Sequence, residues 1–107
     1  GFYMKNLEKY IDNINYIREK INPLQMIITS SSINSRKELR NGIIVAIIVN
    51  NEDEISEYED FVDDFNEDID NIGVIFFLTT KDNASDDDEI VKGYIVWFPK
   101  TTIKKSM

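Results

Sequence analysis

The chain has 107 residues and a formal net charge of −8, from 20 acidic and 12 basic side chains. It contains no cysteine and no histidine, which excludes disulfides, thiolate chemistry and the usual ligands of a structural zinc site. This composition predicts a single domain over residues 1–107 that avoids nucleic acid and anionic membranes and favours basic partner proteins.

The two ends of the chain differ from its middle. Residues 1–3 are interpreted as an expression remnant, because Met4, Lys5 and Asn6 read as a natural start. No signal-peptide core follows, and the longest apolar runs are far shorter than the roughly 20 residues that span a bilayer. We therefore expect a cytoplasmic protein. Residues 100–107 form a basic C-terminal tail.

The first part of the chain predicts one helix and one strand. An apolar stripe at steps of three and four residues predicts a helix over residues 5–22, ended by Pro23: Leu7, Tyr10, Ile11, Ile14, Ile17 and Ile21. Residues 24–29 read as a strand, and residues 30–34 as a polar loop. Ser35 and Glu38 have the spacing of a capping box, which predicts a short helical turn through Arg40.

The second part predicts a buried strand, an amphipathic helix and two more strands. Ile43–Val49 is apolar at every position, as expected of a strand buried on both faces. A helix then begins at a capping box, either Asn51 with Glu54 or Ser56 with Glu59, and ends at Gly73. Its apolar stripe comprises Ile55, Tyr58, Val62, Phe65, Ile69 and Ile72. Strands are predicted over residues 74–79 and 90–98, separated by a polar loop over residues 81–89.

This order predicts an α/β (α+β) two-layer sandwich, α-β-β-α-β-β, with a four-stranded mixed sheet and two helices. The element order resembles a circularly permuted ferredoxin-like plan. Two helices on one side of the sheet leave its second face uncovered, although three strands are apolar on both faces. We therefore expect a homodimer with Tyr94 and Trp97 in its interface. The alternative is that the two helices lie on opposite faces, so that no partner is needed.

Charge is concentrated in one segment. Residues 41–80 contain no lysine or arginine, whereas residues 52–70 contain eleven acids. On a helix these acids fall opposite the apolar stripe. We predict that this face binds a basic partner protein, possibly a nucleic-acid-binding protein or a toxin, through Asp53, Glu57, Asp60, Asp63, Asp64, Glu67 and Asp68.

The leading functional hypothesis is an inhibitor or nucleic-acid mimic that places this acidic helix in the basic groove of its partner. The alternative is a homo-oligomeric scaffold or regulatory module, in which the acids keep the protein soluble and the apolar sheet face is the functional interface. A ligand-binding regulatory domain with a pocket at the sheet edge is a third hypothesis.

We predict no enzymatic activity, no cofactor and no metal. The Ser30–Ser32 run follows a strand, but it lacks the glycines and lysine of a phosphate-binding loop. The basic residues Arg36, Lys37 and Arg40 are interpreted as a solvated cluster or a counterweight to the acids. The acids of residues 82–89 lack the spacing and the glycine of an EF-hand calcium loop.

Overall fold

The computed structural model describes residues 4–68 and 70–97. Predictions about residues 1–3, Ile69, Phe98 and the tail over residues 100–107 therefore lie outside the described residues. The helices are α1 (Ile11–Ile21), α2 (Glu52–Asn66), α3 (Lys81–Ala84) and α4 (Asp88–Val91), with 3-10 turns at η1 (Leu7–Lys9) and η2 (Ser30–Ser32). The strands are β1 (Gln25–Ile28), β2 (Ile43–Val49), β3 (Val74–Thr80) and β4 (Tyr94–Trp97).

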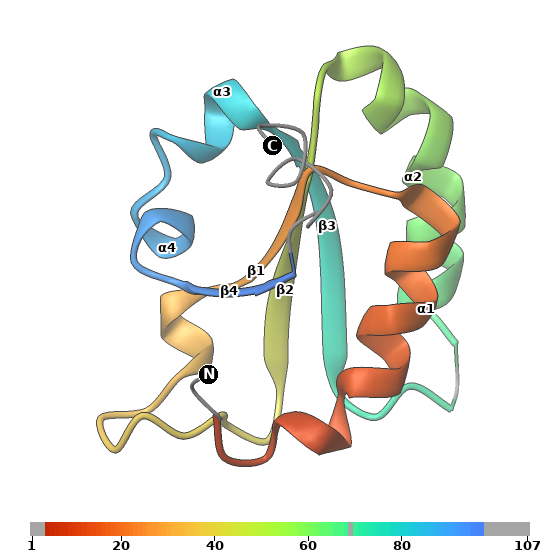
Figure 1. The fold of residues 1–107 in the computed structure, drawn as a ribbon. Helices are drawn as coiled ribbons and strands as arrows, with labels where there is room; N and C mark the ends of the chain where they lie inside the picture. The colour runs from red at the N-terminus through yellow and green to blue at the C-terminus, as the bar shows by residue number, and fades with distance from the viewer. Residues whose placement is uncertain (1–3, 69, 98–107) are drawn as a thin grey trace, which may run out of the picture.

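The predicted fold class is confirmed. Two main helices pack on one side of a four-stranded mixed sheet of order β3-β2-β1-β4 (Figure 1). Strand β1 is antiparallel to β2 and β4, whereas β2 and β3 are parallel and joined through α2. These parallel strands are direct neighbours, not separated by a third strand as in a split βαβ unit. The likeness to the ferredoxin-like plan is therefore one of element order.

The main core lies between the sheet and the two long helices. From α1 it receives Ile14, Ile17 and Ile21, the buried part of the predicted stripe. The helix begins later than predicted, because the chain first forms the 3-10 turn at Leu7–Lys9. It ends at Asn22, which takes a left-handed conformation and donates its N–H to the Arg18 carbonyl.

Helix α2 is shorter than predicted: it ends at Asn66, seven residues before Gly73. The Asn66 side chain explains where it stops. Its Nδ2 donates to the Phe76 carbonyl at 2.8 Å, and its Oδ1 accepts from the Phe76 N–H at 2.9 Å. The end of α2 is therefore tied to β3, and Ile72 lies beyond the helix with 41% of its surface exposed.

A second asparagine protects the same edge of the sheet. The Asn71 side chain donates to the Val74 carbonyl and accepts from the Val74 N–H, both at 2.9 Å. Because β3 is an edge strand, the main-chain groups of Val74 and Phe76 that face away from β2 would otherwise be open to another strand. The two amides take the place of a neighbouring strand at alternate residues.

The second face of the sheet is partly covered by residues predicted to be a polar loop. Two four-residue helices, α3 and α4, lie across it and bury Ala84 and Ile90 against Ile27, Ala46 and Ile48 (Figure 1). Strand β4 consequently begins at Tyr94 and not at residue 90. Gly93 allows this close packing, since a Cβ there would lie 2.3 Å from the Ile28 carbonyl oxygen.

The predicted helical turn over residues 35–40 does not form. Instead, the Asn34 Oδ1 accepts from the Arg36 and Glu38 N–H groups, at 2.9 and 3.0 Å. This local turn places Lys37 at a φ of 65° and lets Leu39 bridge to Ile33. The Asx turn at Asn34 satisfies the same backbone donors that a helical turn would have used.

Candidate functional site

The candidate site is the outward surface of α2. The helix begins at Asn51, whose side chain accepts from the Glu54 N–H at 3.1 Å. Glu54 in turn accepts from the Asn50 N–H at 2.8 Å. Of the two predicted starts, the one at Asn51 and Glu54 is therefore the one used, although the Glu54 carboxylate reaches Asn50 and not the N–H of the cap residue Asn51, as a complete capping box would require. Acids in this first turn are stabilised by the positive end of the helix dipole.

The inner side of α2 fixes the direction of the acids. Val62 is buried, and four partly buried side chains of the same helix pack against the main core: Ile55, Tyr58, Phe61 and Phe65. Phe65 lies edge-on to Phe76 of β3 with ring centroids 5.6 Å apart, and stacks on Tyr16 of α1 at 5.7 Å. Since α2 is held by both the sheet and α1, its polar side faces outward.

All seven residues predicted to bind a partner are exposed: Asp53, Glu57, Asp60, Asp63, Asp64, Glu67 and Asp68. Asp53, Glu57, Asp60 and Asp64 follow one another at steps of four, three and four, so they form one row along the helix. Asp63 flanks this row. Glu67 and Asp68 follow the last residue of α2, where Asp68 accepts from the Asp70 N–H at 2.8 Å.

No basic side chain neutralises this surface within the part of the chain that the structure describes. The ion pairs there are Lys5 with Glu38 and Arg18 with Glu19, and neither involves α2. Burial raises the pKa of the Tyr58 hydroxyl, and the charges of Glu57 and Glu54 raise that pKa further.

A small groove lies beside the acidic row. Between α2 and β3 it has a volume of about 160 Å³, with Glu59 and Asp63 on its helix side and Phe76 and Leu78 on its strand side. Such a groove offers apolar walls for the stem of a lysine or arginine and carboxylates for its charged head.

The two residues predicted for a dimer interface lie on the helix side of the sheet. Tyr94 and Trp97 are partly buried against the main core, and the Arg18 guanidinium lies 5.6 Å from the centre of the Trp97 ring. They do not lie on the second sheet face, whose uncovered apolar area motivated the dimer prediction.

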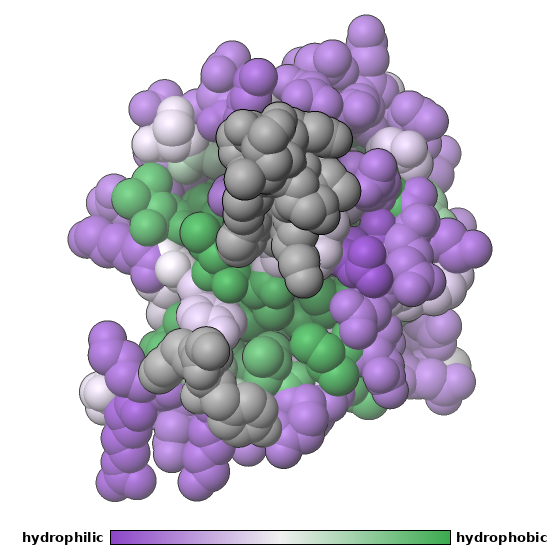
Figure 2. All heavy atoms as spheres, in the orientation of Figure 1, coloured by the Kyte–Doolittle hydropathy of each residue, from purple (hydrophilic) through white to green (hydrophobic). Residues whose placement is uncertain are grey.

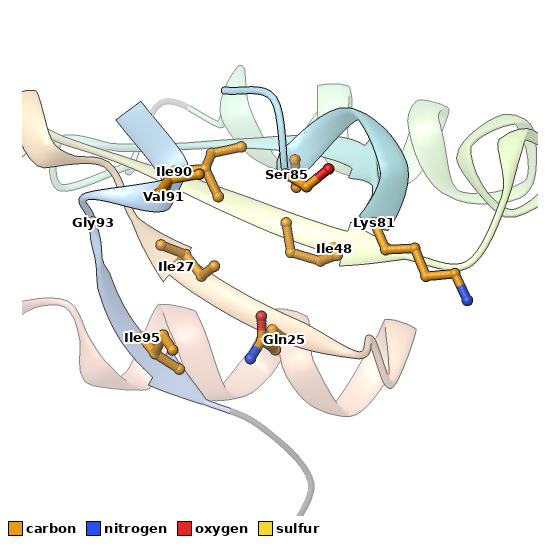
Figure 3. A pocket seen from close by; sticks show the side chains of 10 residues that line it. Gln25, Ile27, Ile48, Lys81, Ser85, Ile90, Val91, Gly93 and Ile95 are labelled. Atoms are coloured by element: carbon orange, nitrogen blue, oxygen red, sulfur yellow. The ribbon is translucent and has the colours of Figure 1, made fainter. Parts of the chain in front are cut away.

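A pocket on that second face was not predicted from the sequence. It has a volume of about 280 Å³ and lies between β1, β2, β4 and the two short helices. Figure 3 shows Ile90 and Val91 at one end, Ile48 and Lys81 at the other, and Gln25 and Ile95 on a third side. The sequence signal for it was faint, because α3 and α4 are too short to show a helical period.

The serine run and the acidic loop have structural roles. Ser32 is buried, and its Oγ accepts from the Ile44 N–H at 2.8 Å. The Ser31 N–H donates to the Glu89 Oε1 at 2.8 Å, so this backbone donor of the serine run is already bonded to a carboxylate of the chain itself. This hydrogen bond lowers the pKa of Glu89. Asp87 accepts from the Glu89 N–H and caps α4.

The predicted basic cluster of Arg36, Lys37 and Arg40 does not come together as one site. The Arg40 Nε donates to the Ser31 carbonyl at 3.0 Å, whereas Lys37 lies in a separate cavity with Lys92. Within residues 4–68 and 70–97, no group of three or more acids is arranged to hold a metal ion.

Comparison with known protein families, curated proteins and solved structures finds no match for this chain. Among the described helices, none is long and apolar enough to cross a membrane. The surface chemistry of the molecule is therefore the basis for its functional interpretation.

Proposed function

We propose that this protein is a small acidic protein-binding domain that docks the outward face of α2 on a basic partner protein. In this role it is an inhibitor, or a nucleic-acid mimic that occupies the groove in which the partner binds DNA or RNA. The observation that supports the proposal is the density of unneutralised charge along α2.

That density resembles one strand of DNA. Eight of the fifteen residues of α2 are acids: Glu52, Asp53, Glu54, Glu57, Glu59, Asp60, Asp63 and Asp64. At 1.5 Å per residue the helix is about 22 Å long, so it presents one charge per roughly 3 Å. A DNA strand presents one phosphate per roughly 3.4 Å of axis. A basic groove that binds a phosphate backbone would therefore meet negative charges at a comparable spacing along α2.

The acidic row is also rigid. Asn51 caps the start of α2, and Asn66 ties its end to Phe76 through two hydrogen bonds. A surface that is already ordered loses little conformational entropy on binding. Electrostatic attraction to a basic partner would also accelerate association, with a strong dependence on salt.

Solubility alone is a weaker explanation of this surface. Three like-charged pairs lie four residues apart within α2: Asp53 with Glu57, Glu59 with Asp63, and Asp60 with Asp64. Each pair costs about 0.2–0.5 kcal/mol of helix stability. A surface needed only for solubility would mix both signs and avoid this cost.

The test is a salt-titrated pull-down from source cells, with mass spectrometry of the eluate and competition of the captured protein by double-stranded DNA. We expect the double variant Asp60→Lys with Asp64→Lys to lose capture. The matched control is Asp12→Lys with Asp86→Lys, which makes the same change in net charge at two exposed acids outside α2. Capture retained by the α2 variant, or lost equally in the control, would contradict the proposal.

A further inference from the structure

A cavity with two lysines lies at the β4 edge of the sheet, on the side of the molecule away from the acidic helix (Figure 1). We propose that this cavity binds a small phosphate monoester, with Lys37 and Lys92 contacting the phosphate group. The inference goes beyond the proposed function of α2, since α2 is tied to β3 at the opposite edge of the sheet.

The cavity has the size and the walls to hold a small organic molecule. Its volume is about 290 Å³, near the lower end of the range for ligand pockets. Apolar surface comes from the buried Met4 and from the partly buried Ile33 and Tyr94. The polar lining residues are Ser30, Asn34, Lys37 and Lys92. A molecule with an apolar or ring-shaped body and an anionic group matches both kinds of wall.

The charges of the two lysines are not neutralised by the chain itself. Within the part of the chain that the structure describes, neither lysine forms an ion pair, and no acidic residue lines the cavity. Two acids of neighbouring segments are held by other groups: Glu38 pairs with Lys5 at 3.5 Å, and Glu89 accepts from the Ser31 N–H at 2.8 Å. That hydrogen bond is the main cause of the lowered pKa of Glu89, and the charge of Lys92 is the smallest contribution.

Two ammonium groups at one cavity favour a dianion over a monoanion. A phosphate monoester carries a charge of about −1.5 to −2 near pH 7, whereas a carboxylate carries only one negative charge. Lysine is a common phosphate ligand, and it acts there as a point charge. The hydroxyl of Ser30, which lines the same cavity, can donate a hydrogen bond to a phosphate oxygen.

The acids elsewhere in the molecule do not prevent an anion from binding here. Strands β3 and β4 are three strand spacings apart, which is about 14 Å. This separation exceeds the Debye length of about 8 Å at physiological salt, so the exposed charges of α2 are largely screened. The exposed acids Asp82, Asp86 and Asp88 do not line the cavity. Figure 2 shows hydrophilic side chains over the loop that follows η2, at the lower left, with hydrophobic ones beside them toward the middle of the view.

The backbone at Lys37 is strained in a way that the turn itself does not require. Its φ is 65°, and the other described residues with a positive φ are two asparagines and a glycine, which adopt this conformation more readily. The turn is held by Asn34, whose carbonyl accepts from the Lys37 N–H at 3.0 Å. Glycine at position 37 would form the same turn with less strain, so the turn does not explain the lysine side chain. Strained residues of this kind cluster at binding sites.

Binding of phenyl phosphate to the full chain tests the proposal. By isothermal titration calorimetry we expect saturable binding of one molecule, tighter than the binding of inorganic phosphate, because the ring adds contact with Ile33 and Tyr94. Benzyl alcohol, which has a ring without the charge, should not bind. Absence of saturable binding overturns the proposal, and equal affinity for inorganic phosphate shows an adventitious ion only.

The two lysines have a matched control in the same loop. Lys37→Gln and Lys92→Gln should each weaken the binding of phenyl phosphate by about tenfold or more, since each removes a charged hydrogen bond. Arg36→Gln makes the same change in net charge, but Arg36 does not line the cavity and its replacement should leave the affinity nearly unchanged. Wild-type affinity in either lysine variant, or an equal loss in Arg36→Gln, overturns the proposal.

Lys37→Gly separates binding from stability. Without ligand it should raise the melting temperature by a few degrees, because glycine relieves the strained backbone, and it should weaken phenyl phosphate as Lys37→Gln does. A lower melting temperature would show that Lys37 serves the stability of the loop and would count against the proposal. The double variant Asp60→Lys with Asp64→Lys should still bind phenyl phosphate, so failure of this site and failure of the proposed function of α2 are distinguishable.

Discussion

Replacing Asn66 with alanine removes both hydrogen bonds that join the end of α2 to the outer edge of β3. The lost bonds are 2.8 Å from the amide nitrogen to the Phe76 carbonyl and 2.9 Å from the Phe76 N–H to the amide oxygen. A buried polar group left without a partner costs about 1–3 kcal/mol. Since water reaches the sheet edge from one side, the lower end of that range applies, about 1 kcal/mol for each group.

The replacement also has a favourable component. Alanine is a better helix former than asparagine by about 0.5 kcal/mol, so the net loss of unfolding free energy is about 1.5 kcal/mol. For a domain of this size, that loss lowers the melting temperature by roughly 6–12 °C. The assay is urea unfolding followed by circular dichroism, in which the midpoint should fall while the slope stays unchanged.

Asn15→Ala is the matched control, because Asn15 is an exposed asparagine within α1 that makes none of these bonds. It should stabilise the protein by the helix-propensity difference alone. The unprotected edge of β3 should also make Asn66→Ala more prone to aggregate than Asn15→Ala. If Asn66→Ala proves as stable as Asn15→Ala, the two amide bonds do not hold α2 to the sheet and the reasoning is refuted.

Two further predictions concern the contact between β1 and the α4 segment. Gly93→Ala should lower the free energy of unfolding by about 3 kcal/mol or more, measured in urea, because the new Cβ would lie 2.3 Å from the Ile28 carbonyl oxygen. Gly42→Ala is the control: its Cβ would lie 3.7 Å from the nearest atom, so it should cost far less. Equal losses of unfolding free energy for Gly93→Ala and Gly42→Ala would contradict the close packing of Gly93 against β1. The Ser31 N–H lowers the pKa of Glu89, so this carboxylate adds stability above the usual glutamate range and loses that contribution as the pH falls through its lowered pKa. An NMR titration of Glu89 checks this, and a pKa at or above the usual value would exclude the Ser31 contact in solution.

Most of the long elements could be predicted from the sequence because their periodicity is strong. The all-apolar run at Ile43–Val49 forms β2 with the predicted bounds, and the acids of α2 face outward as its stripe requires. The errors arise where one side chain decides the local structure. Asn66 ends α2 early, and Asn34 replaces the predicted helical turn after Ile33 with an Asx turn.

The candidate sites also divide into one that local periodicity predicts and one that depends on tertiary contacts. The acidic row was predictable, since a helical period of 3.6 residues assigns each side chain to a face without knowledge of the rest of the fold. The pocket beside Val91 was not, because its walls come from three strands and two helices of four residues each. Tyr94 and Trp97 were assigned to the open face, but the register of β4 with β1 turns them toward the helices.

The sequence by itself therefore determined that charge and apolar surface are separated along α2, because local helical geometry depends only on residue spacing. Tertiary structure alone decided the strand order, how the β3 edge of the sheet is protected, and which part of the second face of the sheet is covered by α3 and α4. Those features depend on contacts between residues far apart in the chain, such as Asn66 with Phe76 or Ser31 with Glu89. Local sequence patterns do not predict such contacts, because each of the two residues looks like an ordinary polar or apolar residue in its own segment.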